Sequence, residues 1–303
     1  MNKSLQYTLL AVGVLALSTS AIFVMLATAP APIIAFYRML FSSVLLLPFI
    51  LIKKSAKAQI KSFTKQQWMF SFWAGVLLAS HYVLWFESLR FTSIASSTIL
   101  VTLQSIFSFI GAYWLFKERI QNAALLAGVI AIAGSFIVGW GDFQIGGTAL
   151  FGDALALLGA MTIAFYFLVS QSIRKAVDVI PYTFVVYTIS SFVLLVYNVV
   201  LSNPFTGFPV KDWFWFACLA VIPTILGQLV FVWLVKWVSA STISMSILGE
   251  PIGTIILAYW IFQEHVTLYQ VVGSGVILGG IYMYLVITEK KSTPLTEEAY
   301  TSL

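Results

Sequence analysis

The stretch Ala112-Tyr113-Trp114-Leu115-Phe116-Lys117-Glu118 returns 146 residues later as Ala258-Tyr259-Trp260-Ile261-Phe262-Gln263-Glu264. The same displacement aligns Gly134 with Gly280, and a displacement of 149 aligns Pro32 with Pro181. Self-similarity at a fixed interval indicates that one structural unit is present twice. We therefore predict two repeats of similar architecture, at residues 1–145 and 146–290, followed by a short tail at 291–303.

The composition places both repeats in a membrane. Of the 303 residues, 60% are hydrophobic and only 9% are charged, whereas soluble chains carry about 25% charged residues. A membrane-spanning helix needs about 20 apolar residues, and the apolar runs are too long and too aperiodic for the strands of a membrane barrel. The sequence therefore predicts an all-α polytopic membrane protein with ten transmembrane helices, near residues 6–28, 32–52, 67–88, 92–116, 121–140, 150–172, 180–201, 212–236, 240–262 and 267–288.

The distribution of positive charge predicts the orientation. With the amino terminus inside, the cytoplasmic segments hold Lys3, Lys53, Lys54, Lys57, Lys61, Lys65, Lys117, Arg119, Arg174, Lys175, Lys236, Lys290 and Lys291, whereas the outer loops hold only Arg90 and Lys211. This is a positive-inside pattern, and it predicts a multi-pass protein of the plasma membrane with both termini in the cytoplasm. The pattern also accounts for the net charge of +5 without a nucleic-acid partner. The partner of the Lys53–Lys65 cluster is expected to be the lipid bilayer, through its anionic headgroups.

Five is an odd number of spans, so the second repeat is expected to enter the membrane inverted relative to the first. The charges of the repeated motif agree, because Lys117 and Arg119 in the first copy are replaced by Gln263 and His265 in the second. Inverted repeats are a common architecture of secondary transporters. The sequence therefore favours a transporter that works by alternating access.

Several motifs resemble those of the EamA type of the drug/metabolite transporter superfamily: Phe116-Lys117-Glu118-Arg119-Ile120, Glu250-Pro251 with Phe262-Gln263-Glu264-His265-Val266, and Gly152-Asp153. The resemblance implies transport of a small-molecule substrate, an amino-acid-like or amphipathic metabolite, and implies export. Uptake of a metabolite or vitamin is the alternative within transport, and a non-transporting membrane scaffold or sensor is the alternative of another class. This chain departs from the family at Gln104-Ser105, where proline often stands second, so no kink is predicted there.

Glu250 is the strongest candidate for a functional residue. It lies eleven residues beyond Ser239, about 16 Å along a helix, and therefore near the membrane midplane. Pro251 cannot donate a backbone hydrogen bond, so we expect a bent helix at this point, with Gly249 and Gly253 beside it. Intramembrane carboxyl groups usually mark transport pathways, which predicts contact with substrate or with a coupling proton. The alternative is a structural carboxyl group bonded to a neighbouring helix.

The repeat places Gln104 at the position equivalent to Glu250, and both are expected to line a central cavity. His81, Tyr82 and Trp85 share one side of the third span and are expected to form an amphipathic wall, although a lone histidine can equally bond two helices together. The further cavity candidates are Ser97, Ser246, Tyr166, Tyr187, Thr19 and Gln228.

Other polar residues are expected to be structural or to act in gating. Arg38 is predicted either to extend toward the outer surface or to pair with Glu87. Asp153 is predicted to cap the amino terminus of the sixth span. Gly275 and Gly279 are spaced for close helix packing, either within the subunit or in a homodimer, so the alternatives of monomer and homodimer stay open.

The sequence lacks the motifs for ATP hydrolysis, nucleophilic catalysis and zinc binding. The chain has no Gly-x-x-x-x-Gly-Lys loop for ATP and no nucleophile elbow. Two histidines, His81 and His265, and one cysteine, Cys218, do not compose a zinc site. We therefore expect no enzyme activity, no cofactor and no metal.

Overall fold

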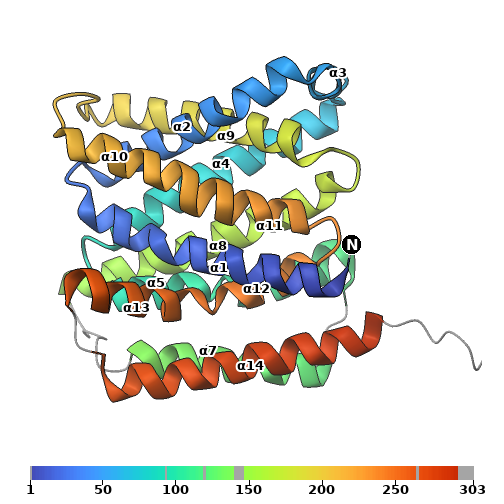
Figure 1. Ribbon diagram of the computed structural model, residues 1–303, viewed down its shortest axis with the longest axis vertical. Helices are drawn as coiled ribbons and strands as arrows, with labels where there is room; N and C mark the ends of the chain where they lie inside the picture. Colours follow the sequence, from blue (N-terminus) through green and yellow to red (C-terminus); the bar gives the residue numbers. More distant parts are fainter. Residues whose placement is uncertain (1, 93, 119–120, 140–146, 264–265, 293–303) are drawn as a thin grey trace, which may run out of the picture.

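In the computed structural model, the secondary structure of the described residues consists of helices (Figure 1). The structure describes residues 2–92, 94–118, 121–139, 147–263 and 266–292. The helices are α1 (Lys3–Leu26), α2 (Ala31–Ile52), α3 (Lys54–Lys61), α4 (Lys65–Ser88), α5 (Ile94–Thr102), α6 (Gln104–Phe116), α7 (Asn122–Gly139), α8 (Gly147–Arg174), α9 (Val179–Val200), α10 (Val210–Leu219), the π-helix η1 (Ala220–Gln228), α11 (Leu229–Leu234), α12 (Ala240–Ile247), α13 (Glu250–Phe262) and α14 (Leu268–Ser292).

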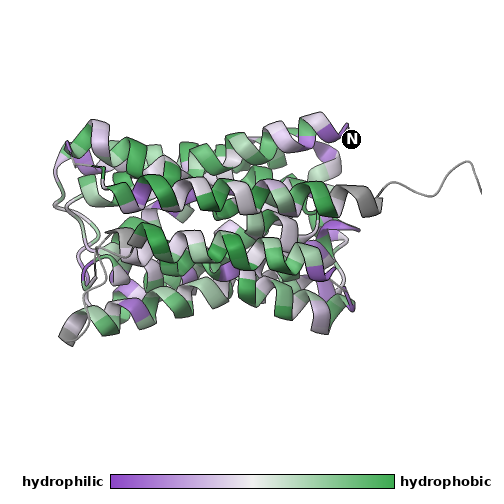
Figure 2. Ribbon diagram, turned by 90° about the horizontal axis from the view of Figure 1, so that it is seen from below, coloured by the Kyte–Doolittle hydropathy of each residue, from purple (hydrophilic) through white to green (hydrophobic). Residues whose placement is uncertain are grey.

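The predicted spans correspond to these helices. Nine helical segments in the described residues are long and apolar enough to cross a membrane, and Asn122–Val138 is a shorter apolar helix at the remaining predicted position. Hydrophobic residues predominate along the helices, and hydrophilic ones gather toward both ends of the bundle (Figure 2). The prediction of an all-helical, multi-pass membrane protein is therefore confirmed. The short helix α3 was not predicted.

The two halves pack in corresponding ways. In the order of the chain, α1 of the first half is equivalent to α8 of the second half, and α2 is equivalent to α9. Helix α4 is equivalent to the continuous segment α10–η1–α11. The contacts of α4 with α8 and of α1 with η1 are then equivalent, as are those of α6 with α8 and of α1 with α13. In two further contacts, α2 with α9 and α7 with α14, each helix packs against its own equivalent in the other half. This is the pattern of an isologous interface, in which the same surfaces meet across a two-fold axis.

The fourth span of each half is interrupted at an equivalent residue. In the second half α12 ends at Ile247 and α13 begins at Glu250, and Gly249 has φ −75° and ψ −12°. In the first half α5 and α6 are separated at Leu103, with φ −64° and ψ 0°. The bend predicted next to Pro251 is therefore present. The first half is interrupted as well, although Gln104-Ser105 lacks the proline.

Hydroxyl groups account for the break that lacks a proline. Thr102 Oγ1 donates to the carbonyl of Ile99 over 2.7 Å, and Ser105 Oγ donates to the carbonyl of Thr102 over 3.3 Å. The backbone N–H of Leu103 bonds instead to Leu100, and that of Ile106 to Leu103. Threonine and serine side chains compete with the helical ladder in this way. In the second half the equivalent bonds run from Gly249 to Ser246 and from Ile252 to Gly249.

Both repeated motifs end in the same backbone conformation. Lys117 has φ 55° and ψ 27°, and Gln263 has φ 57° and ψ 31°. These are left-handed values, which commonly terminate a helix. The repeat seen in the sequence therefore extends to individual backbone angles. Arg119, Ile120, Glu264, His265, the predicted repeat boundary at 145/146 and the tail from 293 lie outside the described residues.

The π-helix η1 contains Pro223, which has no N–H for the carbonyl of Leu219. The hydroxyl of Thr224 donates to that carbonyl over 2.7 Å, so the carbonyl keeps a partner. A π segment places an extra residue in a turn and is frequent at functional sites. Here it brings Thr224 and Gln228 to the buried side of the helix.

The last helix packs against α7 through glycines other than the predicted pair. A Cβ atom on Gly134 would lie 2.7 Å from the backbone nitrogen of Ile277, and one on its equivalent, Gly280, would lie 2.6 Å from that of Ala131. Only glycine permits backbones this close. Gly275 and Gly279 have nothing within 4 Å of such an atom. The prediction that they support packing within the subunit was wrong, because they lie on the opposite side of α14.

Candidate functional site

A cavity lies in the interior of the bundle, between the two halves. It is lined by Leu17, Arg38, His81, Tyr82, Trp85, Val101, Gln104, Ile163, Phe167, Gln228, Ile247 and Glu250. Its volume is about 30 Å³, which has room for about two water molecules. The predicted lining residues Glu250, Gln104, His81, Tyr82, Trp85 and Gln228 are therefore brought together.

Equivalent residues of the two repeats face each other in this cavity. The displacement of 146 residues relates Tyr82 to Gln228, and it also relates Gln104 to Glu250. Tyr82 and Gln228 are joined directly, since the tyrosine hydroxyl donates to Gln228 Oε1. Leu17 with Ile163, and Val101 with Ile247, are two further equivalent pairs in the lining. The cavity therefore lies where the two halves meet.

Arg38 points into the bundle and not toward the surface. Its side chain is only 1% exposed. Nε donates to Thr224 Oγ1 over 2.8 Å and Nη1 donates to Ser20 Oγ over 2.7 Å, while the guanidinium lies 4.3 Å from the ring centroid of Tyr82. These contacts hold a positive charge beside the cavity, where charge-assisted hydrogen bonds and the aromatic face stabilise it.

The predicted alternatives for Arg38 were both wrong. Glu87 pairs with Arg90 instead, over 3.4 Å, and the Arg90 side chain is 62% exposed. The arginine is turned inward because α1 and η1, which pack against each other, provide two hydroxyl acceptors that the membrane does not. Glu87 thus belongs to a surface ion pair, which contributes little to stability.

Glu250 is held through its backbone while its side chain lines the cavity. Its carbonyl accepts from Ser18 Oγ over 3.0 Å and from Thr254 Oγ1 over 3.1 Å. Gly253 brings α13 close to α1, since a Cβ atom there would lie 2.3 Å from Ser18 Oγ. Arg38 and Glu250 line the same cavity, but among the described residues no ion pair within 4.0 Å joins them.

His81 both lines the cavity and bonds a neighbouring helix, so its two predicted roles are combined. Its Nδ1 lies 3.0 Å from the carbonyl of Gly159 on α8. A carbonyl only accepts, so Nδ1 carries a proton. The ring stacks on Trp85, with centroids 5.6 Å apart and an angle of 23° between the planes. Together they form an aromatic wall.

Two polar atoms of the lining have no hydrogen-bond partner among the described residues. They are Gln104 Oε1 and Trp85 Nε1, and both are buried. Buried polar groups are nearly always bonded to protein or to water. Both atoms belong to side chains that line the cavity, and neither is accessible to water in this conformation.

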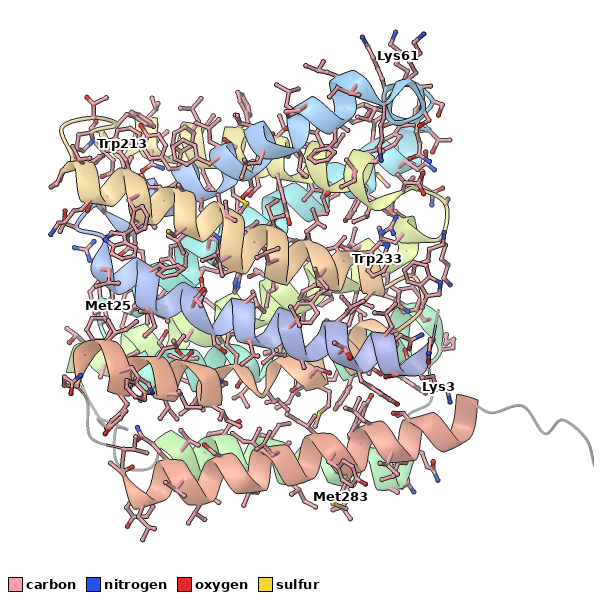
Figure 3. The ribbon with its side chains drawn as sticks, in the orientation of Figure 1. Lys3, Met25, Lys61, Trp213, Trp233 and Met283 are labelled. Carbon is pink, nitrogen blue, oxygen red and sulfur yellow. The ribbon has the colours of Figure 1, made fainter. Side chains whose placement is uncertain are left out.

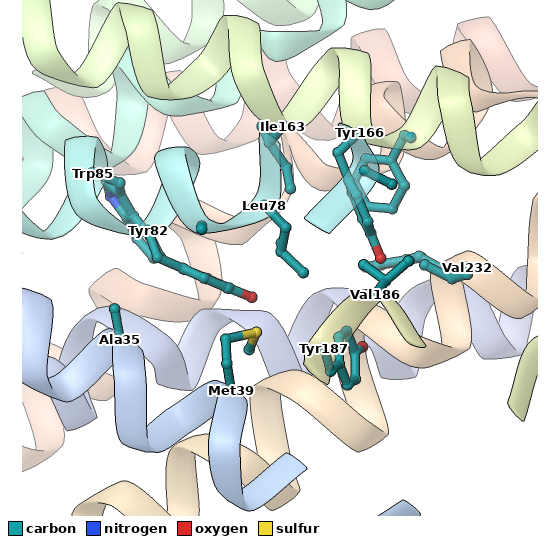
Figure 4. Close-up of a cluster of buried hydrophobic side chains, with 14 of the residues drawn as sticks. Ala35, Met39, Leu78, Tyr82, Trp85, Ile163, Tyr166, Val186, Tyr187 and Val232 are labelled. Atoms are coloured by element: carbon teal, nitrogen blue, oxygen red, sulfur yellow. The ribbon is translucent and has the colours of Figure 1, made fainter. Parts of the chain in front are cut away.

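Five predicted cavity residues lie outside the lining. Thr19 Oγ1 donates to the carbonyl of Ala16 over 2.7 Å. Ser97 Oγ bonds to Ser88 Oγ over 2.5 Å, and Ser246 Oγ donates to the carbonyl of Thr242 over 2.9 Å. Tyr166 and Tyr187 lie in the hydrophobic core near Val186 and Val232 (Figure 4). Their hydroxyl groups are buried and have no partner among the described residues.

Asp153 is not a helix cap. Helix α8 begins at Gly147, so Asp153 lies more than one turn inside it, and the predicted role was wrong because the helix starts earlier than the apolar run. Asp153 Oδ1 accepts instead from Thr92 Oγ1 over 2.8 Å. It thus ties the first half to the second.

The prediction missed the cavity position of Arg38 and the apolar lining residues Leu17, Val101, Ile163, Phe167 and Ile247. The apolar residues carry no signal of their own in a chain that is 60% hydrophobic. The repeat could have helped to identify them, because Leu17 is equivalent to Ile163, and Val101 to Ile247, at the displacement of 146 residues. No group of three or more His, Cys, Asp or Glu side chains that could hold a metal occurs in the part of the chain that the structure describes.

Comparison with known proteins places this architecture in a family. The model of the EamA-like transporter family matches residues 3–140 and 150–286, one copy in each half. A protein of Bacillus subtilis (strain 168) named uncharacterized transporter YdfC is 24% identical over 269 residues, which are 87% of this chain and 85% of that protein. An uncharacterized transporter of Archaeoglobus fulgidus is 26% identical over 167 residues, and the alignment covers 58% of its length.

The fold is also found in a solved structure. A crystal structure that covers 96% of this chain, and is itself covered completely, superposes with a TM-score of 0.78 at 13% sequence identity. At this identity the likeness concerns the fold alone.

Proposed function

Because this chain belongs to the EamA-like transporter family, we propose that it carries a small organic metabolite across the plasma membrane by alternating access. One observation carries the proposal: Arg38 and Glu250 line a single cavity between the two halves without pairing with each other. Two opposite charges that are buried but separate are costly. A solute that carries both charges would compensate them.

The substrate class follows from the lining. A guanidinium group recognises a carboxylate, and a carboxylate such as that of Glu250 recognises an ammonium group. The stacked rings of His81 and Trp85 offer an apolar surface for a side chain. We therefore infer an amino-acid-like substrate with an apolar or aromatic side chain.

The cavity is too small for such a substrate as it stands. Its volume is about 30 Å³, whereas ligand pockets have about 300 Å³ or more. The corresponding packing of the halves supports a mechanism in which they exchange conformations, with the second repeat inverted in the membrane. The breaks at Leu103 and Gly249 are the hinge positions that we propose, since φ and ψ change most easily where the helical ladder is already interrupted.

The proposal includes the direction of transport and the orientation of the protein in the membrane. Lys3 and Lys61 lie at one end of the bundle, and Met25 and Trp213 lie at the other (Figure 3). The positive-inside rule assigns the lysine end to the cytoplasm, and the family resemblance favours export. Glu250 is the residue that we expect to exchange a coupling proton.

The test is flux through proteoliposomes that hold the purified protein. Labelled aromatic and aliphatic amino acids are followed with and without a proton gradient. The wild type should transport at least one zwitterion, and Glu250→Gln should reduce that flux, while the control Glu87→Gln at the surface ion pair should not. Equal flux in Glu250→Gln and the wild type would refute the site. No flux of any solute would favour a scaffold or sensor, and flux only toward the lysine end would favour uptake.

A further inference from the structure

A second cavity lies at the end of the bundle. It has a volume of about 280 Å³ and is lined by Lys53, Ser55, Ala56, Arg174, Asp178, Val179, Ile180, Pro181, Trp233, Lys236 and Trp237. These residues come from the α2–α3 junction, the α8–α9 turn and the end of α11. None of them lines the central cavity.

The cavity carries an excess of positive charge. Three cations, Lys53, Arg174 and Lys236, face a single carboxylate, Asp178. No ion pair within 4.0 Å involves these four side chains among the described residues. Like charges that share one cavity raise its positive potential. An anion that binds there would relieve their repulsion.

Arg174 is held as a fixed part of the wall. Its side chain is 2% exposed, Nε donates to the carbonyl of Val232 over 3.0 Å, and Nη1 donates to the carbonyl of Val177. Both acceptors are neutral, so these bonds orient the guanidinium without cancelling its charge. Lys53 and Lys236 are exposed and can adjust to a bound group.

The other walls are those of a membrane interface. Trp233 and Trp237 pack edge to face with ring centroids 5.1 Å apart, and Lys236 Nζ lies 5.7 Å from the Trp237 ring. Tryptophan rings concentrate at the level of the lipid headgroups. Trp233 lies toward the end of the bundle that carries Lys3 and Lys61 (Figure 3).

The cavity lies next to a surface that suits acyl chains. Leu51 and Ile52, the last residues of α2 before Lys53, are 62% and 79% exposed. A molecule with its anionic group in the cavity would lay its apolar part along this end of α2. A free anion would gain nothing from these side chains, so the surface favours a lipid over a soluble ligand.

We propose that this cavity binds the phosphate group of an anionic phospholipid. Lys53 and Lys236 contact the phosphate oxygens, Arg174 supplies fixed positive potential, and the tryptophans pack against the glycerol region. The site is separate from the transport cavity, and its occupancy ties the α2–α3 junction to the α8–α9 turn and to α11. The bound lipid therefore acts as a structural ligand at one end of the bundle.

The test measures lipid retention by the full-length protein. The protein is released from nanodiscs that contain equal amounts of phosphatidylglycerol and phosphatidylcholine, and the retained lipids are counted by native mass spectrometry. The wild type should retain phosphatidylglycerol selectively. Each lysine near a membrane surface contributes about 1 kcal/mol to attraction of anionic lipid, so Lys53→Gln with Lys236→Gln should lower the selectivity roughly 30-fold.

Matched variants separate this site from general surface charge. Lys117→Gln with Lys175→Gln removes the same charge from the same end of the protein, where Lys175 lies over the ring of Phe116, but outside both the cavity and the Lys53–Lys65 cluster, and it should keep most of the selectivity. Lys53→Arg with Lys236→Arg should keep it as well. The proposal is overturned if the wild type shows no preference, if the cavity variant retains lipid like the wild type, or if the control loses as much. If millimolar glycerol phosphate displaces the lipid, the proposal that the bound phosphate belongs to a phospholipid is overturned, and the cavity is a site for a soluble phosphate.

Discussion

The two halves of this protein share a backbone plan but differ in the chemistry of their side chains. The helix breaks at Leu103 and Gly249 and the helix ends at Lys117 and Gln263 have matching dihedral angles. At the cavity, however, Gln104 stands opposite Glu250. The backbone symmetry suits an exchange of conformations between the halves, whereas the unequal side chains give the cavity its polarity.

A second difference concerns Arg38. With the displacement that aligns Pro32 with Pro181, its equivalent is Tyr187, which lies in the hydrophobic core. The first half therefore supplies the positive charge of the cavity and the second half supplies the negative one. A solute bound between them would contact both halves, which couples binding to their relative movement.

The largest effect is expected when the charge of the first half is removed. Arg38→Met keeps most of the side-chain volume but removes the guanidinium. Zwitterion flux should fall at least about 100-fold, because hydrogen bonds to a charged group contribute about 1.5–3 kcal/mol each. The measurement is initial flux in proteoliposomes at equal protein content. Arg90→Met, at the exposed ion pair, is the control and should leave flux unchanged. A flux above a tenth of the wild-type value would contradict a role for Arg38 in binding.

The next largest effect is expected when the negative charge of the second half is removed. Glu250→Gln gives both fourth spans a glutamine at the cavity. Flux should fall by about 10- to 100-fold, consistent with loss of one charge-assisted hydrogen bond, and the remaining flux should no longer respond to a proton gradient. Unchanged coupling would assign the proton to another group.

A swap of the two residues sharpens the same comparison. Gln104→Glu combined with Glu250→Gln returns the carboxylate to the cavity from the opposite half. Because the two positions are equivalent about the cavity, we expect the double variant to recover part of the flux that Glu250→Gln loses. A double variant no better than Glu250→Gln alone would mean that the position of the carboxylate relative to Arg38 matters more than its presence.

A smaller effect is expected at the helix break of the first half. Ser105→Pro introduces the proline that the second half carries at Pro251. Since the ladder is already interrupted at Leu103, the stability should change by less than about 1 kcal/mol. Ser108→Pro, farther inside α6, is the matched control and should cost about 3 kcal/mol. Thermal unfolding of the purified variants measures both. Equal losses would show that the break is not tolerant of proline.

The smallest effect is expected at the two left-handed helix ends. Lys117→Gly and Gln263→Gly should each stabilise by up to about 1 kcal/mol, because the relief of roughly 1–2 kcal/mol of left-handed strain outweighs the conformational entropy that glycine adds to the unfolded chain. Lys117→Ala and Gln263→Ala remove the same side chains but keep the Cβ atom, so they should bring no stabilisation. The order glycine above alanine in the thermal midpoint should hold in both halves. A reversal in one half would break the backbone equivalence.

Several features could be predicted from the sequence for identifiable reasons. Apolar runs marked the helices, since a bilayer imposes their length, and the repeated motif marked the two units. The carboxylate at Glu250 stood out because ionisable groups are rare within spans. Its equivalent, Gln104, then followed from the repeat, and both line the cavity.

Other features depended on contacts that no local pattern reveals. The helix breaks at Leu103 without proline because two hydroxyl groups bond to the carbonyls of Ile99 and Thr102, the helical acceptors of Leu103 and Ile106. Tyr166 and Tyr187 are core residues although the sequence suggested that they line the cavity. In each case the deciding partner is a specific hydrogen bond or a packed neighbour, and periodicity alone cannot supply it.

The sequence by itself determined the membrane setting, the positions of the helices and the existence of two equivalent halves, because hydrophobicity and self-similarity are properties of the chain. Only the tertiary structure decided which polar groups meet. Arg38 is the clearest case, since it turns inward to Ser20 and Thr224, which lie on two other helices. The physical reason is that a buried charge takes the orientation in which it finds hydrogen-bond partners, and those partners come together only when the helices pack.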